Sequence, residues 1–356
     1  MLKDIKETPH ALKTVLNTYF QEDKTIKNIQ IPVDSEKIEK IYIPASGSSR
    51  NAANIARYFI EQAANIPVIV DYAGEFAQRS VSVKQNDVVI PVSQSGETAD
   101  VMAALRKAKE MGMSSFSITN NENSAMHKLA DTGMLICAGH EESIPATKTF
   151  TCQLMSLYIL GVYLAEKKKT ISLKEAEVIK EKLFEIPDKI SANINEFTEK
   201  IFETSNKIKD YSDLIIVGRG QNFGLADETA LKIQETSYIN AFGYPTGEFM
   251  HGHLAILEEK SPIISIVTET FDNSRSNALA IENIQDIKDR RNPFIILIGH
   301  NRIEWADIFI QINEQDRIIT LFLTVVLLQL LAYKTATLLE RDTINPRSLK
   351  KTVLNE

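Results

Sequence analysis

The amino-acid sequence predicts an α/β protein made of two tandem domains, each with a parallel β-sheet between layers of helices. Short runs of β-branched residues alternate with segments whose apolar residues recur at helical spacing, which is the pattern of parallel βαβ units. The same order of patterns occurs twice along the chain. With 356 residues, 44% of them hydrophobic, the chain is long enough for two cores.

The internal repeat is clearest at two turns in each half. Gly47 lies in a Ser-Gly-Ser turn and Gly74 opens a Gly-Glu-Phe turn 27 positions later. Gly220 closes a Gly-Arg-Gly turn, and Gly247 opens a second Gly-Glu-Phe turn, again 27 positions later. Further predicted strands then follow in matching order: 88–92, 115–119 and 134–137 in the first half, and 262–267, 293–298 and 308–310 in the second. We therefore expect two related domains.

Hydroxyl and amide side chains crowd the point where the predicted strand 87–92 gives way to the predicted helix 99–111. A helix that begins there offers unpaired backbone N–H groups and the positive end of its dipole, which together suit an oxyanion. A simple N-cap is the alternative, but four such side chains around one glycine exceed what a cap needs. We expect the following residues to cradle a phosphate: Ser93, Gln94, Ser95 and Thr98.

A second loop of the same kind, residues 46–49, follows the predicted strand 40–44 and opens a helix. A Gly-Ser-Ser turn is weak evidence by itself. However, the carboxyl ends of neighbouring parallel strands meet at one edge of a sheet, where open α/β folds bind ligands. We therefore expect Ser48 and Ser49 to lie beside the first cradle.

The second half lacks a comparable hydroxyl loop, because residues 267–271 read Val-Thr-Glu-Thr-Phe. It instead offers a predicted helix, 225–240, with Glu228, Lys232 and Glu235 on one face. This trio is either a functional group of charges or a solvated ladder of salt bridges, and the pattern favours neither.

Composition argues against several function classes. The formal net charge of −7 disfavours nucleic acid as a partner, which usually requires a basic face. Residues 1–13 are polar and mixed, so we expect no secretory leader. The longest apolar run, 318–332, is interrupted by Thr and Gln and falls short of the roughly 20 residues of a bilayer span. It predicts a buried core helix rather than a membrane anchor.

Neither a metal site nor a disulfide framework is indicated. Cys137 and Cys152 each lie in an apolar stretch, which is typical of a protein of the reducing cytoplasm. His251 and His253 are too isolated a pair for a metal site. We therefore expect no metal and no other cofactor.

A helical connector is predicted between the halves, because residues 166–210 are rich in Lys and Glu and begin with a capping box of Ser172 and Glu175. The expected organisation is a helical arm (1–35), a phosphate-binding domain (36–165), the connector (166–205), a second domain (206–340) and a C-terminal active-site tail (341–356).

Six motifs together resemble the sugar isomerase (SIS) family, in particular the paired SIS domains of the glutamine:fructose-6-phosphate aminotransferases. They are SGSS (46–49), SQSGETAD (93–100), ATKTF (146–150), ALKIQETSYI (230–239), GEFMHG (247–252) and PRSLKKTV (346–353). The resemblance covers essentially the whole chain and implies two flavodoxin-like three-layer αβα domains. Because Met1 leads almost directly into the isomerase part, the stand-alone double-SIS proteins are the expected comparison.

The resemblance also implies roles for individual residues. Glu235 matches the base that moves a proton between C1 and C2 of the sugar, with Lys232 lining the site beside it. His251 matches the residue that assists ring opening and reaches the site of the neighbouring subunit. Lys351 matches the amine that forms a Schiff base with the ketose. The phosphate shell is matched by Ser49 and the four residues of the loop 93–98.

Three departures from the family pattern lie near the expected sugar rather than the phosphate. Ala146, preceded by Pro145, replaces a serine, and Lys350 replaces a small residue beside Lys351. His253 stands where the family's His-Gly is usually followed by proline. These departures therefore alter expected contacts to the sugar and leave the predicted phosphate contacts unchanged.

Taken together, these patterns predict a cytoplasmic, homodimeric phosphosugar enzyme. The expected reaction converts glucosamine 6-phosphate to fructose 6-phosphate and ammonia. A fructosamine-6-phosphate deglycase is the enzymatic alternative, and a non-catalytic regulator that senses sugar phosphates is the alternative from another class. Retention of Glu235, His251 and Lys351 favours an enzyme.

Overall fold

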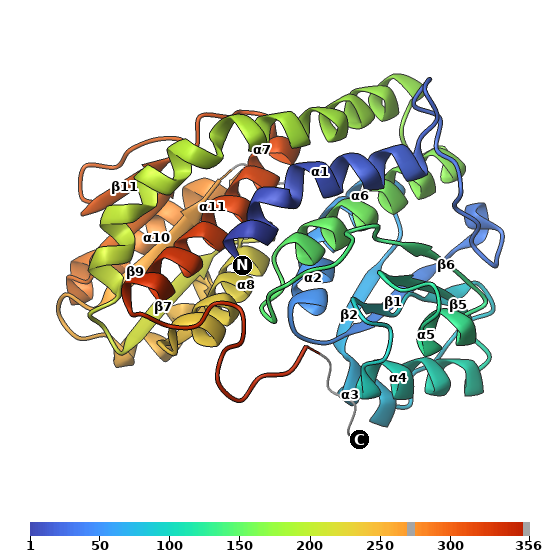
Figure 1. Cartoon of the computed structure of the whole chain (residues 1–356), viewed down its shortest axis with the longest axis horizontal. Helices are drawn as coiled ribbons and strands as arrows, with labels where there is room; N and C mark the ends of the chain where they lie inside the picture. The colour runs from blue at the N-terminus through green and yellow to red at the C-terminus, as the bar shows by residue number, and fades with distance from the viewer. Residues whose placement is uncertain (269–274, 352–356) are drawn as a thin grey trace. The chain divides into compact units, whose positions relative to one another are not determined.

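The computed structural model describes residues 1–268 and 275–351, which form two compact units, each built on one sheet (Figure 1). The N-sheet unit contains residues 7–141 and 146–184 and the chain end from Lys350. The C-sheet unit contains residues 1–6, 142–145 and 185–349. Each unit is described by itself below.

The N-sheet is parallel throughout. Its strands are β1 (Lys40–Ala45), β2 (Val68–Tyr72), β3 (Asp87–Val89), β4 (Val92–Ser93), β5 (Ser114–Thr119) and β6 (Thr132–Leu135). β3 and β4 both lie between β1 and β5, so the order across the sheet is β2, β1, β3 with β4, β5, β6. The expectation of one continuous strand 87–92 was wrong, because Pro91 has no N–H to donate to the ladder.

The C-sheet repeats this topology. Its strands are β7 (Asp213–Gly218), β8 (Asn240–Pro245), β9 (Pro262–Val267), β10 (Phe294–Gly299) and β11 (Ile308–Gln311). They pair in parallel in the order β8, β7, β9, β10, β11. The first strand of each sheet therefore lies between the second and the third, which confirms the predicted repeat and the flavodoxin-like fold.

Helices cover both faces of each sheet, as a parallel sheet requires (Figure 1). The N-sheet unit has α2 (Gly47–Ala64), α3 (Ala73–Gln78), α4 (Ala99–Glu110), α5 (Ala125–Leu129), α6 (Lys148–Lys168) and the short η1 (Ser35–Lys37). The C-sheet unit has α8 (Gln221–Ser237), α9 (Thr246–Phe249), η2 (His253–Ile256), α10 (Ser276–Arg291) and α11 (Arg317–Leu338). Both units contribute residues to α1 (Leu2–Tyr19) and α7 (Leu173–Ile208).

Helix α11 is the core helix that the apolar run predicts. It is long and apolar enough to cross a membrane by length and composition, but 89% of its most apolar window is buried inside the protein. The carboxylate of Asp316 begins the helix by accepting hydrogen bonds from the backbone N–H groups of Ile318 and Ile319. The apolar surface of α11 is thus used for folding.

Sequence signals predicted the start of α7 correctly and the end of α8 incorrectly. The capping box at α7 is formed, since Glu175 N donates to Ser172 Oγ and Ser172 N donates to Glu175 Oε2. The predicted helix 225–240, in contrast, ends at Ser237, because Tyr238 takes a left-handed conformation with φ 62°. That conformation directs the chain into β8, and a tyrosine gives no sequence signal for it.

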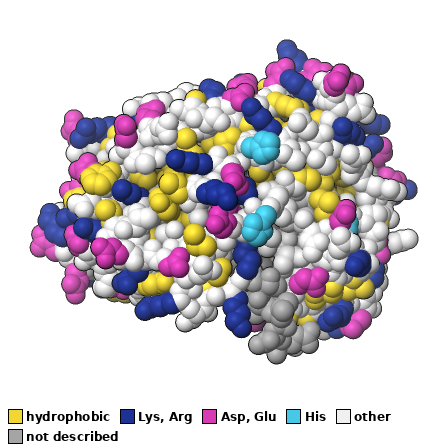
Figure 2. Space-filling view, in the orientation of Figure 1, with side chains coloured by type: hydrophobic (Ala, Val, Ile, Leu, Met, Phe, Trp, Pro, Cys, Tyr) yellow, Lys and Arg dark blue, Asp and Glu magenta, His cyan; other side chains and the backbone are white. Residues whose placement is uncertain are grey.

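Charges of both signs are interspersed over the face that Figure 2 shows, rather than gathered by sign.

Cys137 and Cys152 are free thiols. Burial raises the pKa of both, so neither is a thiolate at neutral pH.

Candidate active site

The two hydroxyl loops of the N-sheet unit begin side by side at the carboxyl edge of the sheet, because Ala45 of β1 pairs with Val92 of β4. Ser46 and Thr98 are the N-cap residues of α2 and α4, yet neither side chain makes a capping hydrogen bond. The side chains of Ser46 and Thr98 therefore do not act as the simple N-caps that sequence left open. Both residues lie at helix N-termini, where an anion is favoured.

The loop 93–98 is held in shape by its own backbone. Gly96 N donates to Ser93 Oγ at 3.1 Å, and Glu97 N donates to Ser95 Oγ at 3.1 Å. Ser93 Oγ also lies 3.0 Å from Thr98 Oγ1. Gly96 has φ 68°, and a Cβ there would lie 2.2 Å from Ser124 Oγ, so glycine is required.

Other residues predicted to bind the sugar phosphate also belong to the N-sheet unit. Gln94 is half-buried, and its carbonyl accepts hydrogen bonds from Asn120 N and Thr119 Oγ1. Ser49 Oγ accepts from Gln153 Nε2 at 2.9 Å, and Ser48 is half-buried. Ala146 is also half-buried and supplies no hydroxyl where the family pattern has one.

A buried carboxylate that sequence reasoning missed lies in the same unit. Glu141 is 3% exposed. Its Oε1 accepts hydrogen bonds from Thr147 N at 2.9 Å and Thr149 N at 3.1 Å, and its Oε2 accepts from Thr149 Oγ1 at 2.6 Å. These donors stabilise a charge that burial alone would disfavour. The available signal was an acidic residue shortly before the Thr-Lys-Thr motif.

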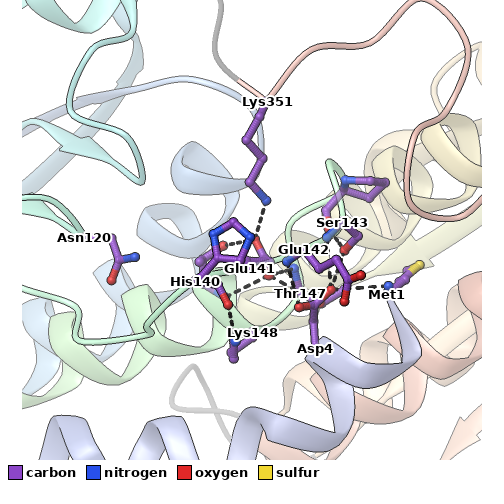
Figure 3. A network of polar contacts seen from close by, with 12 residues as sticks. Met1, Asp4, Asn120, His140, Glu141, Glu142, Ser143, Thr147, Lys148 and Lys351 are labelled. Atoms are coloured by element: carbon purple, nitrogen blue, oxygen red, sulfur yellow. Dashed lines mark hydrogen bonds and ion pairs between the residues drawn. The ribbon is translucent and has the colours of Figure 1, made fainter.

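Lys351 from the C-terminal tail reaches this carboxylate, as Figure 3 shows. Its Nζ donates to Glu141 Oε2 at 2.7 Å, and its side chain is 30% exposed. Lys350 is exposed too, but no hydrogen bond or ion pair holds its side chain among the described residues. Lys148 of the Thr-Lys-Thr motif has structural partners: its Nζ donates hydrogen bonds to Glu7 Oε2 and to the carbonyl of His140, each at 2.7 Å.

The charged trio of α8 lies in the C-sheet unit and is not a solvated ladder. Lys232 is 2% exposed, and its Nζ pairs with Glu235 Oε2 and lies 3.7 Å from Glu228 Oε1. Glu228 is buried, whereas the Glu235 side chain is 22% exposed. Buried charges are costly unless they are paired, and here the Lys232 ammonium is paired with both carboxylates. Glu235 is the partly accessible member of the trio.

A cavity of about 490 Å³ opens beside Glu235. It is lined by residues of α8, by the turn that follows it, and by the tail: Leu231, Gln234, Glu235, Tyr238, Ile239, Asn240, Arg347, Ser348 and Leu349. Tyr238 anchors the tail here. Its Oη accepts a hydrogen bond from Arg347 N at 2.9 Å, and the Arg347 guanidinium lies 4.1 Å from its ring centroid.

The two histidines singled out by sequence differ in their surroundings within the C-sheet unit. His251 is exposed, and its backbone N donates to Glu248 O at 2.8 Å. The ring of His253 packs on Tyr244, with centroids 4.3 Å apart. Among residues 1–268 and 275–351, no group of three or more His, Cys, Asp or Glu side chains could hold a metal ion.

Comparison with known proteins gives two matches to the SIS domain model, at residues 36–163 and 207–339. A glutamine–fructose-6-phosphate aminotransferase of Chlorobaculum tepidum is 39% identical over 363 residues, which cover 100% of this chain and 58% of that protein. The corresponding protein of Clostridium acetobutylicum is 34% identical, with 100% and 59% covered. The chain thus spans somewhat under three fifths of these relatives.

Solved structures give the same picture. The C-terminal domain of glucosamine-fructose-6-phosphate aminotransferase from Francisella tularensis matches with a TM-score of 0.90 and 29% identity, covering 97% of this chain and 98% of that one. A glucosamine-6-phosphate deaminase from Thermotoga maritima matches with a TM-score of 0.73 over 99% of this chain and 98% of its own, at 24% identity, which shows the shared fold.

Proposed function

The chain belongs to the SIS-domain family, and we propose that it is a phosphosugar isomerase that interconverts glucosamine 6-phosphate with fructose 6-phosphate and ammonia. The curated relatives are named for an isomerising aminotransferase that acts on fructose 6-phosphate. A structural neighbour is named as a glucosamine-6-phosphate deaminase. These names contain fructose 6-phosphate and glucosamine 6-phosphate, two sugar phosphates with the same six-carbon chain.

The observation that carries the proposal is the contact between Lys351 and Glu141. A lysine in a chain terminus is ordinarily solvated and mobile. Here its amine is bound by a carboxylate that is itself buried and held by threonine donors. The same unit contains the hydroxyl loops at two helix N-termini. An amine nucleophile and a phosphate cradle in one unit support chemistry at a sugar phosphate carbonyl.

We propose the following division of roles. The loop 93–98, with Ser48 and Ser49, binds the phosphate. Glu235 takes the proton from C2 of the open-chain amino sugar and returns it at C1, which converts the C2 amine into an imine. Lys351 exchanges for ammonia at C2, and water then releases fructose 6-phosphate. The balance is one water consumed and one ammonia released.

Lys232 and His251 have supporting roles in this proposal. The Lys232 ammonium keeps the Glu235 carboxylate in place, because the two are paired. His251 assists the opening of the sugar ring, a step that needs a group able to pass a proton to the ring oxygen.

The test uses glucosamine, galactosamine and fructosamine 6-phosphates, with ammonia and ketose phosphate measured separately. We expect fructose 6-phosphate and ammonia in equal amounts from glucosamine 6-phosphate. Lys351→Met should lose this activity, whereas Lys350→Met, a matched change at an exposed neighbour, should keep it. Release of ammonia and an aldose phosphate, without ketose phosphate, from fructosamine 6-phosphate alone would favour a deglycase. Binding of all three substrates without turnover would favour a regulator.

A further inference from the structure

We propose that the C-sheet unit contains a second binding site, for the phosphate group of a small sugar phosphate, with Arg219 as its anion-binding residue. This site lies outside the proposed catalytic residues and does not depend on the reaction proposed above.

A cavity of about 560 Å³ marks the site. Its size is in the range of small-molecule pockets, which extends from about 300 to about 1,000 Å³. It is lined by three segments of one sheet edge, namely the loop from β7 to α8, the end of β8 with α9, and the start of α10: Arg219, Gly220, Pro245, Gly247, Glu248, Ser276 and Leu279.

The internal repeat relates this cavity to the hydroxyl loops of the N-sheet. Gly220 and Gly247 correspond to Gly47 and Gly74, and β7 occupies in its sheet the place that β1 occupies in the N-sheet. In open α/β folds this carboxyl edge is where ligands bind. The second half lost the hydroxyls of the first loop, but it places a guanidinium at the equivalent turn.

The Arg219 side chain is available for a ligand. It is half-buried, and no hydrogen bond or ion pair ties its guanidinium to another residue in the described part of the chain. Its Nη1 lies close to Gly247, because a Cβ added to that glycine would be 3.2 Å away. An unpaired guanidinium in a cavity is suited to bidentate binding of a phosphate.

Three neighbours extend the site. Ser276 is 5% exposed and lines the cavity at the start of α10, a helix of 16 residues. Thr246, between two lining residues, is 1% exposed and has a hydroxyl oxygen without a hydrogen-bond partner among the described residues. Glu248 places a carboxylate at the cavity, which suits a sugar hydroxyl and repels a bare phosphate ion. The site should therefore prefer a sugar phosphate to inorganic phosphate.

The test measures binding of glucitol 6-phosphate by calorimetry, because this probe has no carbonyl and cannot turn over. Wild-type protein should bind two equivalents per chain. Arg219→Met should lose one of them, with at least tenfold weaker binding, and Arg219→Lys should weaken it less. Arg290→Met, at the far end of α10, is the matched control and should keep both. Inorganic phosphate, in a parallel titration, should compete weakly for the Arg219-dependent equivalent.

A second variant separates this proposal from the proposed function. Ser95→Ala should weaken the other equivalent and leave the Arg219-dependent one unchanged. The second site is overturned if wild-type protein binds a single equivalent, or if both Arg219 variants, shown to be folded by circular dichroism, leave two equivalents intact. An Arg219-dependent equivalent in a protein that fails to convert any amino-sugar phosphate would sink only the catalytic proposal.

Discussion

Ser93 and Ser95 use their oxygen atoms to accept hydrogen bonds from backbone N–H groups of their own loop. The hydroxyl hydrogen of Ser95 has no acceptor among the described residues, so it can be donated to a ligand. These hydrogen bonds hold the loop in shape before a ligand binds, which lowers the entropy cost of binding. The Ser95 hydroxyl is therefore the donor that we expect to bind the phosphate.

Ser95→Ala should raise the KM for the phosphorylated sugar. Removing one hydrogen bond to a charged oxygen costs about 1.5 to 3 kcal/mol, which corresponds to roughly a tenfold to 150-fold increase in KM. Steady-state kinetics checks this, with Ser82→Ala at an exposed position as the control. An unchanged KM would place the phosphate elsewhere.

Glu235→Gln should remove the proton transfer while keeping the shape of the side chain. Exchange of deuterium from solvent into C1 or C2 of the sugar should fall by roughly two to four orders of magnitude. Nuclear magnetic resonance of the substrate measures the exchange, and Glu203→Gln, at an exposed position of α7, is the matched control. If exchange continues at the native rate, another residue moves the proton.

At the scale of single residues, the sequence indicated charged side chains whose ion-pair partners are near in sequence. It did not indicate those whose partners are far along the chain. Glu228, Lys232 and Glu235 could be placed on one face because helical spacing fixes it. The role of Glu141 could not be seen in the same way, since its partner Lys351 lies 210 positions away. Such a pairing depends on the whole fold.

Asp4 shows how single hydrogen bonds hold an element in the C-sheet unit. It is 1% exposed, and its carboxylate accepts from Glu142 N, Ser143 N and Ser143 Oγ (Figure 3). Burial opposes ionisation, but these hydrogen bonds outweigh it and hold the pKa of Asp4 below its ordinary value of 3.8. The start of α1 is thereby fixed to the loop 142–145.

Asp4→Asn should therefore lower the free energy of unfolding at pH 7 by about 1 to 3 kcal/mol, because one acceptor is replaced by a donor that faces an N–H. A lowered folded-state pKa stabilises the protein above the unfolded-state pKa, and this contribution is lost as the pH falls through the folded-state value. The difference between wild type and variant should thus shrink below about pH 4 in urea titrations. Asp210→Asn, at an exposed position, should show no such difference.

Helices were predicted well where the spacing of apolar residues and the capping residues indicate the same element. The capping box of α7 and the buried helix α11 follow from such signals. The end of α8 was not predicted, because a tyrosine gives no sequence signal for the left-handed conformation of Tyr238. The break after β3 was missed although Pro91, which has no N–H for the ladder, is visible in the sequence.

At the scale of the whole molecule, the repeat was predictable because both sheets use the same order of strands and turns. The residue segments that make up each unit were not, since residues 1–6 and 142–145 group with the C-sheet by long-range contact. The assembly of chains into an oligomer also cannot be predicted from local sequence patterns. We propose that the chain forms a C2 dimer in which His251 serves the active site of the partner subunit.

Mixing His251→Ala with Glu235→Gln protein tests this arrangement. A mixed dimer would contain one active site with both native residues, so part of the activity should return after subunit exchange. Exchange is followed by mass spectrometry of differently tagged chains, and each variant alone is the control. If exchange is complete and activity stays absent, His251 acts within its own chain.

The central claim is that the tail amine of Lys351 acts on the carbonyl of a sugar phosphate, and borohydride trapping tests it most directly. An imine between Lys351 Nζ and C2 of fructose 6-phosphate would form with loss of water, and hydride addition at C2 would convert it to a stable secondary amine. Peptide mass spectrometry should find the adduct on Lys351 and not on Lys350. Lys350→Met should still be labelled, and Lys351→Met should not. Absence of an adduct on Lys351, or equal labelling of exposed lysines, would contradict the account.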